Sequence, residues 1–166
     1  MAADETDVNP GSDRRRTVPL PPGWRLCLLL VAGVVPWIVV LGGGGGVSFV
    51  HAFGILTLDP TTLTNLYEYL FVLTDGLPRR LQVWPASVLL YSAAVASAFG
   101  GILGREDPRL TAGLLVFAGI AQVHLAYGLV RVGVTVVPVA PIVLWGIVWW
   151  AYWPMVRNRG LLGPGV

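Results

Sequence analysis

The sequence has little charge. Asp, Glu, Lys and Arg make up only 12% of its 166 residues, and all eleven basic residues are arginine. An average soluble domain has roughly 25% charged residues, so a chain this poor in charge cannot cover a surface that faces water. We therefore expect much of its surface to face a lipid bilayer. The arginines flank apolar runs without forming a basic stripe, which excludes nucleic acid as a partner.

Residues that carry metal or nucleophile chemistry are also few. The single cysteine, Cys27, excludes an internal disulfide framework, and its apolar surroundings favour an inert buried thiol. His51, Asp59, Glu68 and Asp75 are spaced irregularly, so no metal site is predicted. No serine lies in the G-x-S-x-G setting of a hydrolase. We predict no catalytic residue, no cofactor-binding residue and no metal ligand.

Long apolar runs account for most of the chain, and their lengths are typical of helices that cross a bilayer. The sequence predicts an all-α membrane protein, a four-transmembrane-helix bundle with one amphipathic interfacial helix in the first outer loop. The predicted spans cover residues 24–43, 85–104, 110–130 and 134–153, and the interfacial helix covers about residues 60–73. They form a transmembrane domain of residues 24–156, between a disordered tail of residues 1–23 and a second tail of residues 157–166.

Prolines and glycines set the predicted boundaries. Asp59-Pro60 supplies a cap and a first-turn proline for the interfacial helix, and Gly133 divides the last long run into two spans. Pro36 is expected to kink the first span, which neighbouring helices can accommodate. Residues 47–58 could be a loop, a re-entrant segment or an extended piece packed on the bundle. The proline-rich spacer after Arg16 argues against a cleaved signal peptide.

The distribution of arginine predicts the orientation, because positive residues concentrate on the cytoplasmic side of a membrane. With the N-terminus inside, eight arginines lie on the cytoplasmic side and three on the outer side. The cytoplasmic set is Arg14, Arg15, Arg16, Arg25, Arg105, Arg109, Arg157 and Arg159, and the outer set is Arg79, Arg80 and Arg131. We expect a multi-pass protein of the cell membrane with both termini in the cytoplasm.

The second predicted span carries small residues at four-residue spacing, which allows two helix backbones to approach closely in lipid. One row is Ala93, Ser97 and Gly101, and the other is Ala96, Gly100 and Gly104. We predict helix packing at these rows, either inside the bundle or between two copies of the chain.

The third predicted span carries a polar face made by His124, Tyr127 and Arg131. Ionisable residues inside a span are costly and suggest a function. They could relay protons or bind a ligand together with Tyr91 or Ser87 of the second span. The simpler interpretation is a neutral, hydrogen-bonded His124 with Arg131 directed toward the interface, because no acidic partner lies in any span.

Several motifs together resemble a family of small uncharacterised multi-pass membrane proteins from halophilic archaea. The matching stretches are Val35 to Trp37, Thr64 to Phe71, Gly76 to Pro78, Trp84 to Tyr91, Asp107 to Arg109, Thr111 to Gly113, and Trp145 to Pro154. The resemblance covers most of the chain after Gly23. It implies a polytopic membrane protein, and it carries no catalytic residue over to this chain.

The favoured hypothesis is a non-enzymatic membrane protein with a role in assembly, scaffolding or partner binding. Its expected partners are the lipid bilayer and other membrane proteins or further copies of the same chain. One alternative is a small transporter or channel subunit that uses the polar face of the third span. A second alternative is an intramembrane enzyme that acts on a lipid, which requires a polar cavity between the second and third spans.

Overall fold

The first helix is shorter than the apolar run that contains it, because a proline ends it. The computed structural model describes residues 20–42, 46–58, 60–72, 83–131 and 133–161. Helix α1 (Pro22–Val34) starts with a proline, whose missing amide hydrogen has no helical partner at that position. A residue that precedes a proline is forced out of the helical region, and Val35 is extended, with φ −63° and ψ 139°.

After α1 the chain forms a five-stranded antiparallel sheet in the order β4-β3-β2-β1-β5. The strands are β1 (Ile38–Leu41), β2 (Val47–Val50), β3 (Gly54–Leu58), β4 (Thr61–Asn65) and β5 (Thr135–Pro138). Valine, isoleucine and threonine, which suit a pleated backbone, dominate these segments. The first four strands follow one another as a meander. The fifth comes from the other end of the chain and pairs with β1, so that Ile38 lies opposite Pro138.

The remaining elements are helical. They are α2 (Leu66–Phe71), α3 (Val83–Ile102), α4 (Pro108–Val130), α5 (Ala140–Ile147), the π-helical turn η1 (Val148–Tyr152) and α6 (Trp153–Leu161). Helix α4 is capped at its start by the side chain of Asp107, which accepts a hydrogen bond of 2.9 Å from the amide of Arg109. The turns that precede α4 and β5 contain Gly104 and Gly133 with φ of 72° and 83°, values that favour glycine.

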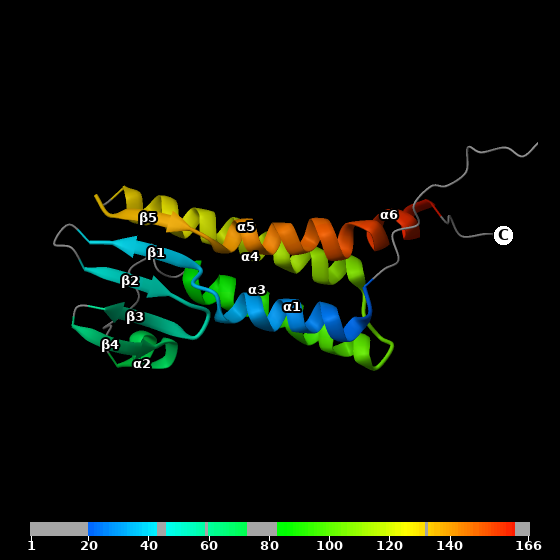
Figure 1. Cartoon of the computed structure of the whole chain (residues 1–166), viewed down its shortest axis with the longest axis horizontal. Helices are drawn as coiled ribbons and strands as arrows, with labels where there is room; N and C mark the ends of the chain where they lie inside the picture. The colour runs from blue at the N-terminus through cyan, green and yellow to red at the C-terminus, as the bar shows by residue number, and fades with distance from the viewer. Residues whose placement is uncertain (1–19, 43–45, 59, 73–82, 132, 162–166) are drawn as a thin grey trace, which may run out of the picture.

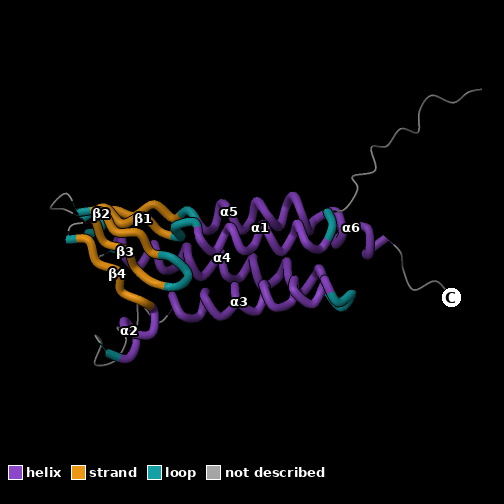
Figure 2. The backbone as a smooth tube through the Cα atoms, turned by 60° about the horizontal axis from the view of Figure 1, so that its bottom comes forward, coloured by secondary structure: helices purple, strands orange, loops and turns teal. Residues whose placement is uncertain are grey.

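The molecule is elongated and the sheet lies at one end of it, where the last part of α4 runs beside β5. Helices α1, α3 and α4 and the continuous rod α5–η1–α6 run alongside one another, with the sheet and α2 at one end (Figure 1). A second view shows the same separation of strands from helices (Figure 2). The start of α1 and the end of α6 both lie at the end remote from the sheet.

The buried apolar residues form two clusters, one among the helices and one between the sheet and the helices. One buried cluster lies among the helices and includes Leu29, Leu115 and Leu144, each with no exposed surface. A second cluster joins β1 to α3 and α4 through Ile38 and Trp84. The sheet is therefore packed onto the ends of the helices by apolar contacts.

The all-α fold class predicted from the sequence is wrong, because the structure contains a five-stranded antiparallel sheet. Two of the predicted spans include strands: β1 occupies residues 38–41 of the first, and β5 occupies residues 135–138 of the fourth. Among the described helices, only α3 and α4 are long and apolar enough to cross a membrane. A four-transmembrane-helix bundle is therefore not the architecture of this chain.

The predicted first outer loop also differs from the structure. Residues 47–58, for which three alternatives were open, form strands β2 and β3. The predicted interfacial helix of residues 60–73 begins only at Leu66, because Thr61–Asn65 pair with β3. The cap is Asn65, whose side chain accepts a hydrogen bond of 2.7 Å from the amide of Glu68. Most of the predicted disordered tail of residues 1–23 lies outside the described residues.

The contact between α4 and α5 gives a test of this packing. A Cβ atom added at Gly119 would collide with the indole nitrogen of Trp145, which donates a hydrogen bond of 3.3 Å to the carbonyl of Val116. Gly119→Ala should lower the free energy of unfolding by about 1–3 kcal/mol, the usual cost of overpacking. Gly113→Ala on the same helix is the matched control, because nothing lies within 4 Å of its added Cβ. Unfolding titrations that give equal stabilities for the two variants would contradict this packing.

Candidate functional site

The end of α1 is held by two side chains that follow it in the chain, Trp37 and His51. Pro36 has no amide hydrogen to donate to the carbonyl of Ala32, and the indole N–H of Trp37 bonds that carbonyl instead, at 3.1 Å. The ring nitrogen Nδ1 of His51 lies 3.1 Å from the carbonyl oxygen of Val34. These contacts satisfy backbone groups that every helix end leaves without helical partners.

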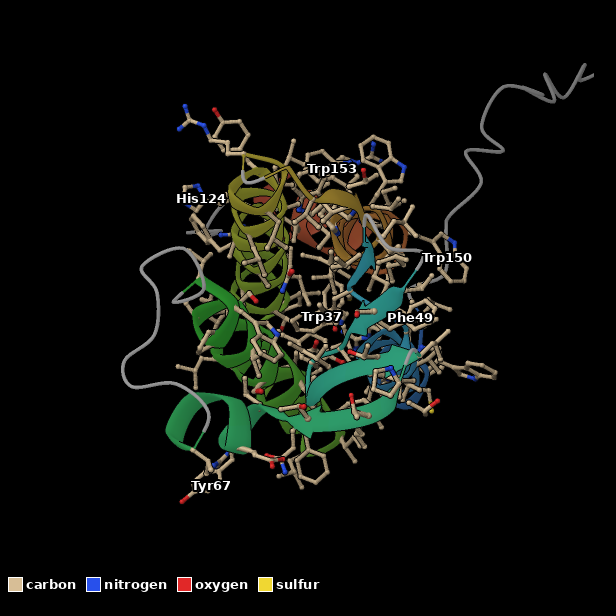
Figure 3. All side chains as sticks on the ribbon, turned by 90° about the vertical axis from the view of Figure 1, so that its left-hand side faces the viewer. Trp37, Phe49, Tyr67, His124, Trp150 and Trp153 are labelled. Carbon is tan, nitrogen blue, oxygen red and sulfur yellow. The ribbon has the colours of Figure 1, made fainter. Side chains whose placement is uncertain are left out.

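Aromatic residues complete this junction between the helices and the sheet. The rings of Trp37 and Tyr91 meet edge to face with centroids 5.0 Å apart, and the hydroxyl of Tyr91 donates to the carbonyl of Leu29. The indole N–H of Trp84 donates to the carbonyl of His51 at 3.3 Å. Trp37 lies in the middle of the molecule when it is viewed from the sheet end (Figure 3). Tyr91 thus has a structural position beside α1, where it contacts Gly33.

A buried ion pair lies at the opposite end of the helices. A guanidinium nitrogen of Arg25, in α1, is 2.5 Å from Oε2 of Glu106, in the turn between α3 and α4. Their side chains are 9% and 5% exposed. The guanidinium carbon also lies 5.8 Å from the ring centroid of Tyr152 in η1, within the range of a cation–π contact. Gly101 leaves room for the carboxylate, because a Cβ there would be 2.6 Å from Oε2.

Three polar atoms of this cluster have no hydrogen-bond partner among the described atoms: Nε of Arg25, Oε1 of Glu106 and the hydroxyl oxygen of Tyr152. Sequence reasoning missed the cluster, since Arg25 was counted only for orientation and Glu106 was given no role. The sequence shows only that Glu106 follows the end of one apolar run and that Arg25 opens another. Nothing in the sequence indicates that these two ends meet.

Two polar contacts join α3 to α4. The amide nitrogen of Gln122 donates to Oγ of Ser87 at 2.6 Å, and Ser87 donates to the carbonyl of Trp84 at 2.8 Å. Gln122 and Ser87 have no exposed surface. Nearer the turn, the hydroxyls of Ser97 and Thr111 are 2.7 Å apart. The polar residues between the two helices therefore bond to one another, although Oε1 of Gln122 is buried without a hydrogen-bond partner among the described atoms.

His124, Tyr127 and Arg131 lie together on the outward face of α4, at the end near the sheet. The guanidinium carbon of Arg131 is 5.4 Å from the ring centroid of Tyr127. With Gly128, these residues line a hollow of about 470 Å³. His124 points away from the other helices (Figure 3). Tyr91, which was predicted to join them, belongs to the junction beside α1, so the structure brings three of the four residues together.

The small residues of α3 pack in a row that differs from the two predicted rows. The buried small residues on this helix are Ser87, Ala94, Ala98 and Gly101. In the predicted rows, Gly101 is buried, Ser97 and Gly100 are half-buried, Ala93 and Ala96 are exposed, and Gly104 belongs to the turn. The buried row therefore lies one residue away from the predicted positions 93 and 97.

The described part of the chain contains no group of three or more His, Cys, Asp or Glu that could hold a metal ion. Cys27 is exposed on α1, contrary to the buried thiol that its apolar surroundings favoured.

The match of a family model decides the relationship of this chain to known proteins. The model, described as a domain of unknown function (DUF8050), matches residues 5–161. The chain belongs to this family. No curated protein matches it, and no solved structure does.

The Arg25–Glu106 pair predicts a large and asymmetric effect on stability. Arg25→Met or Glu106→Leu alone should lower the free energy of unfolding by about 3–5 kcal/mol, because each leaves a buried charged group without its partner. The double variant Arg25→Met with Glu106→Leu should recover most of this loss, since it leaves no buried charge. Arg105→Gln, an exposed neighbour of Glu106, is the control and should stay within about 0.5 kcal/mol of the parent. Additive effects in the double variant would show that the two side chains do not interact.

Proposed function

We propose that this chain is a multi-pass integral membrane protein of the cell membrane that binds a partner and does not catalyse a reaction. The observation that carries the membrane assignment is the exposure of α3 and α4. In their most apolar stretches only 28% and 33% of the residues are buried. The core helix of a soluble protein would be mostly buried. Leu89 and Phe117, for example, are 71% and 61% exposed, which water disfavours and lipid does not.

The aromatic residues at one end of the helices support the same assignment. Trp149, Trp150 and Trp153 are exposed near the end of the last helical rod, and Trp24 is exposed at the start of α1. These two segments lie at the same end of the molecule (Figure 1). Tryptophan is enriched where a membrane meets water, so we take this end as one membrane boundary. The resemblance to multi-pass membrane proteins of halophilic archaea agrees with this proposal.

The proposed orientation has the sheet outside and both termini in the cytoplasm. Arg25 is buried against Glu106 and no longer counts as a free positive charge. Without it, the arginines still divide as seven on the proposed cytoplasmic side and three on the outer side. In this arrangement α3 and α4 cross the bilayer as a hairpin. Helix α1 and the rod α5–η1–α6 also join the cytoplasmic end to the sheet, so they pass through the bilayer beside the hairpin.

The partner-binding role is supported by the sheet. None of its five strands contains a charged residue. The edge strand β4 has exposed Thr61, Thr62 and Leu63. Exposed edge strands normally carry charges or prolines that block pairing with another chain. An uncharged edge suits the addition of a strand from a partner protein.

The two alternative functions receive less support from the contacts of the described residues. A transporter or channel subunit would direct the polar face of α4 into the protein, whereas His124 points outward (Figure 3) and Tyr127 and Arg131 are exposed. An intramembrane enzyme would need a polar cavity between α3 and α4, whereas the polar side chains there bond to one another.

The membrane assignment is tested by labelling single cysteines from each side. In a Cys27→Ser background, Thr135→Cys on the sheet, away from the edge strand β4, should react with an impermeant maleimide in intact cells. Arg105→Cys, in the turn between α3 and α4, should react only after the membrane is permeabilised. Both positions are exposed, so a site that fails to react on either side of an opened membrane identifies a misfolded variant. Equal reaction of both cysteines in intact cells would overturn the hairpin.

The binding role is tested by the size of the protein extracted from its native membrane in mild detergent. We expect a complex larger than one chain, and Leu63→Lys should convert most of it to the single chain because a charge on the edge strand prevents pairing. Leu58→Lys is the matched control, since Leu58 is also exposed but lies in the inner strand β3. A parent protein that migrates as a single chain would refute the role, as would equal loss of the complex in both variants.

A further inference from the structure

The exposed face of α4 changes from apolar to charged along the helix. Phe117 and Ile120 are 61% and 49% exposed. His124, Tyr127 and Arg131 follow them at spacings of three or four residues, which places all five on one face. A ligand that lies along this face would meet apolar groups first and polar groups at the end of the helix.

The hollow at the polar end has the composition of an anion site. Its lining includes His124, Tyr127, Gly128 and Arg131, so a guanidinium, an imidazole and a phenol belong to residues of one hollow. The described part of the chain contains one ion pair, that of Arg25 with Glu106, so Arg131 has no carboxylate partner there. Its guanidinium lies against the ring of Tyr127, which holds it at the hollow. Guanidinium groups bind phosphate through two parallel hydrogen bonds.

We infer that this face binds a phospholipid with a net negative headgroup. The phosphate is bound at His124, Tyr127 and Arg131, and an acyl chain lies along Ile120 and Phe117. This inference rests on the proposed membrane location, which puts the apolar part of α4 in the hydrocarbon layer and Arg131 at its boundary. The lipid comes from the leaflet on the side of the sheet.

The test uses the full-length protein in neutral detergent micelles, with binding followed by native mass spectrometry. Phosphatidylglycerol should bind more tightly than zwitterionic phosphatidylcholine. Arg131→Gln should weaken the binding of phosphatidylglycerol by about tenfold or more, which is the usual effect of losing a charge-assisted hydrogen bond. Arg109→Gln, an exposed arginine at the other end of the same helix, should leave the affinity unchanged.

Three outcomes would overturn the inference. Equal binding of the two lipids would show that the headgroup charge is not recognised. Equal loss in the Arg131 and Arg109 variants would show general attraction to positive charge rather than a site. Competition by inorganic phosphate as strong as that by phosphatidylglycerol would assign the site to a free anion. A protein that stays dissolved without detergent would instead refute the membrane location, so the two failures can be told apart.

Discussion

The architecture depends on how the end of α1 is satisfied. Pro36 ends the helix and takes away the amide hydrogen that Ala32 would otherwise bond. The carbonyl of Ala32 accepts a hydrogen bond from the indole of Trp37, and the carbonyl of Val34 contacts His51, which directly follows β2. Backbone groups without a hydrogen bond are destabilising in an apolar interior. These contacts reduce that cost and so allow the helix to end sharply. The chain can then turn into a strand inside an apolar run that would otherwise continue as helix.

Buried polar side chains elsewhere in the molecule also have hydrogen-bond or ion-pair partners. Arg25 pairs with Glu106 at one end, Gln122 with Ser87 near the other, and Ser97 with Thr111 between α3 and α4. Each pair joins residues of different elements. At the membrane location that we propose, apolar burial would do little to hold the helices together, so such polar contacts and close backbone approach would carry more of their association. The free Nε, Oε1 and hydroxyl atoms around Arg25 mark the place where this compensation is least complete.

Part of this structure could be predicted from the sequence, and the reasons for the misses are physical. The length and composition of the run from Pro108 to Val130 indicate a helix, and the structure has one there. The run from Leu26 to Leu41 has no change in hydropathy where helix gives way to strand, so only Pro36 distinguished the two. Thr61–Asn65 were read as helix because a cap and a proline precede them, although their threonines favour a strand. The ion pair of Arg25 with Glu106 could not be predicted, because its partners are 81 residues apart in the sequence and only the fold brings them together.

The position of β5 has a consequence for how the molecule assembles. The meander of β1 to β4 involves neighbouring segments and closes short loops, which makes its formation fast. Strand β5 joins β1 only after α3 and α4 have been made, since both lie between them in the chain. During synthesis the edge of β1 that later pairs with β5 therefore has backbone N–H and C=O groups without partners. The strands of this sheet carry no charge that would repel another copy of the chain. The interval before β5 docks is the period in which this chain is most exposed to mispairing.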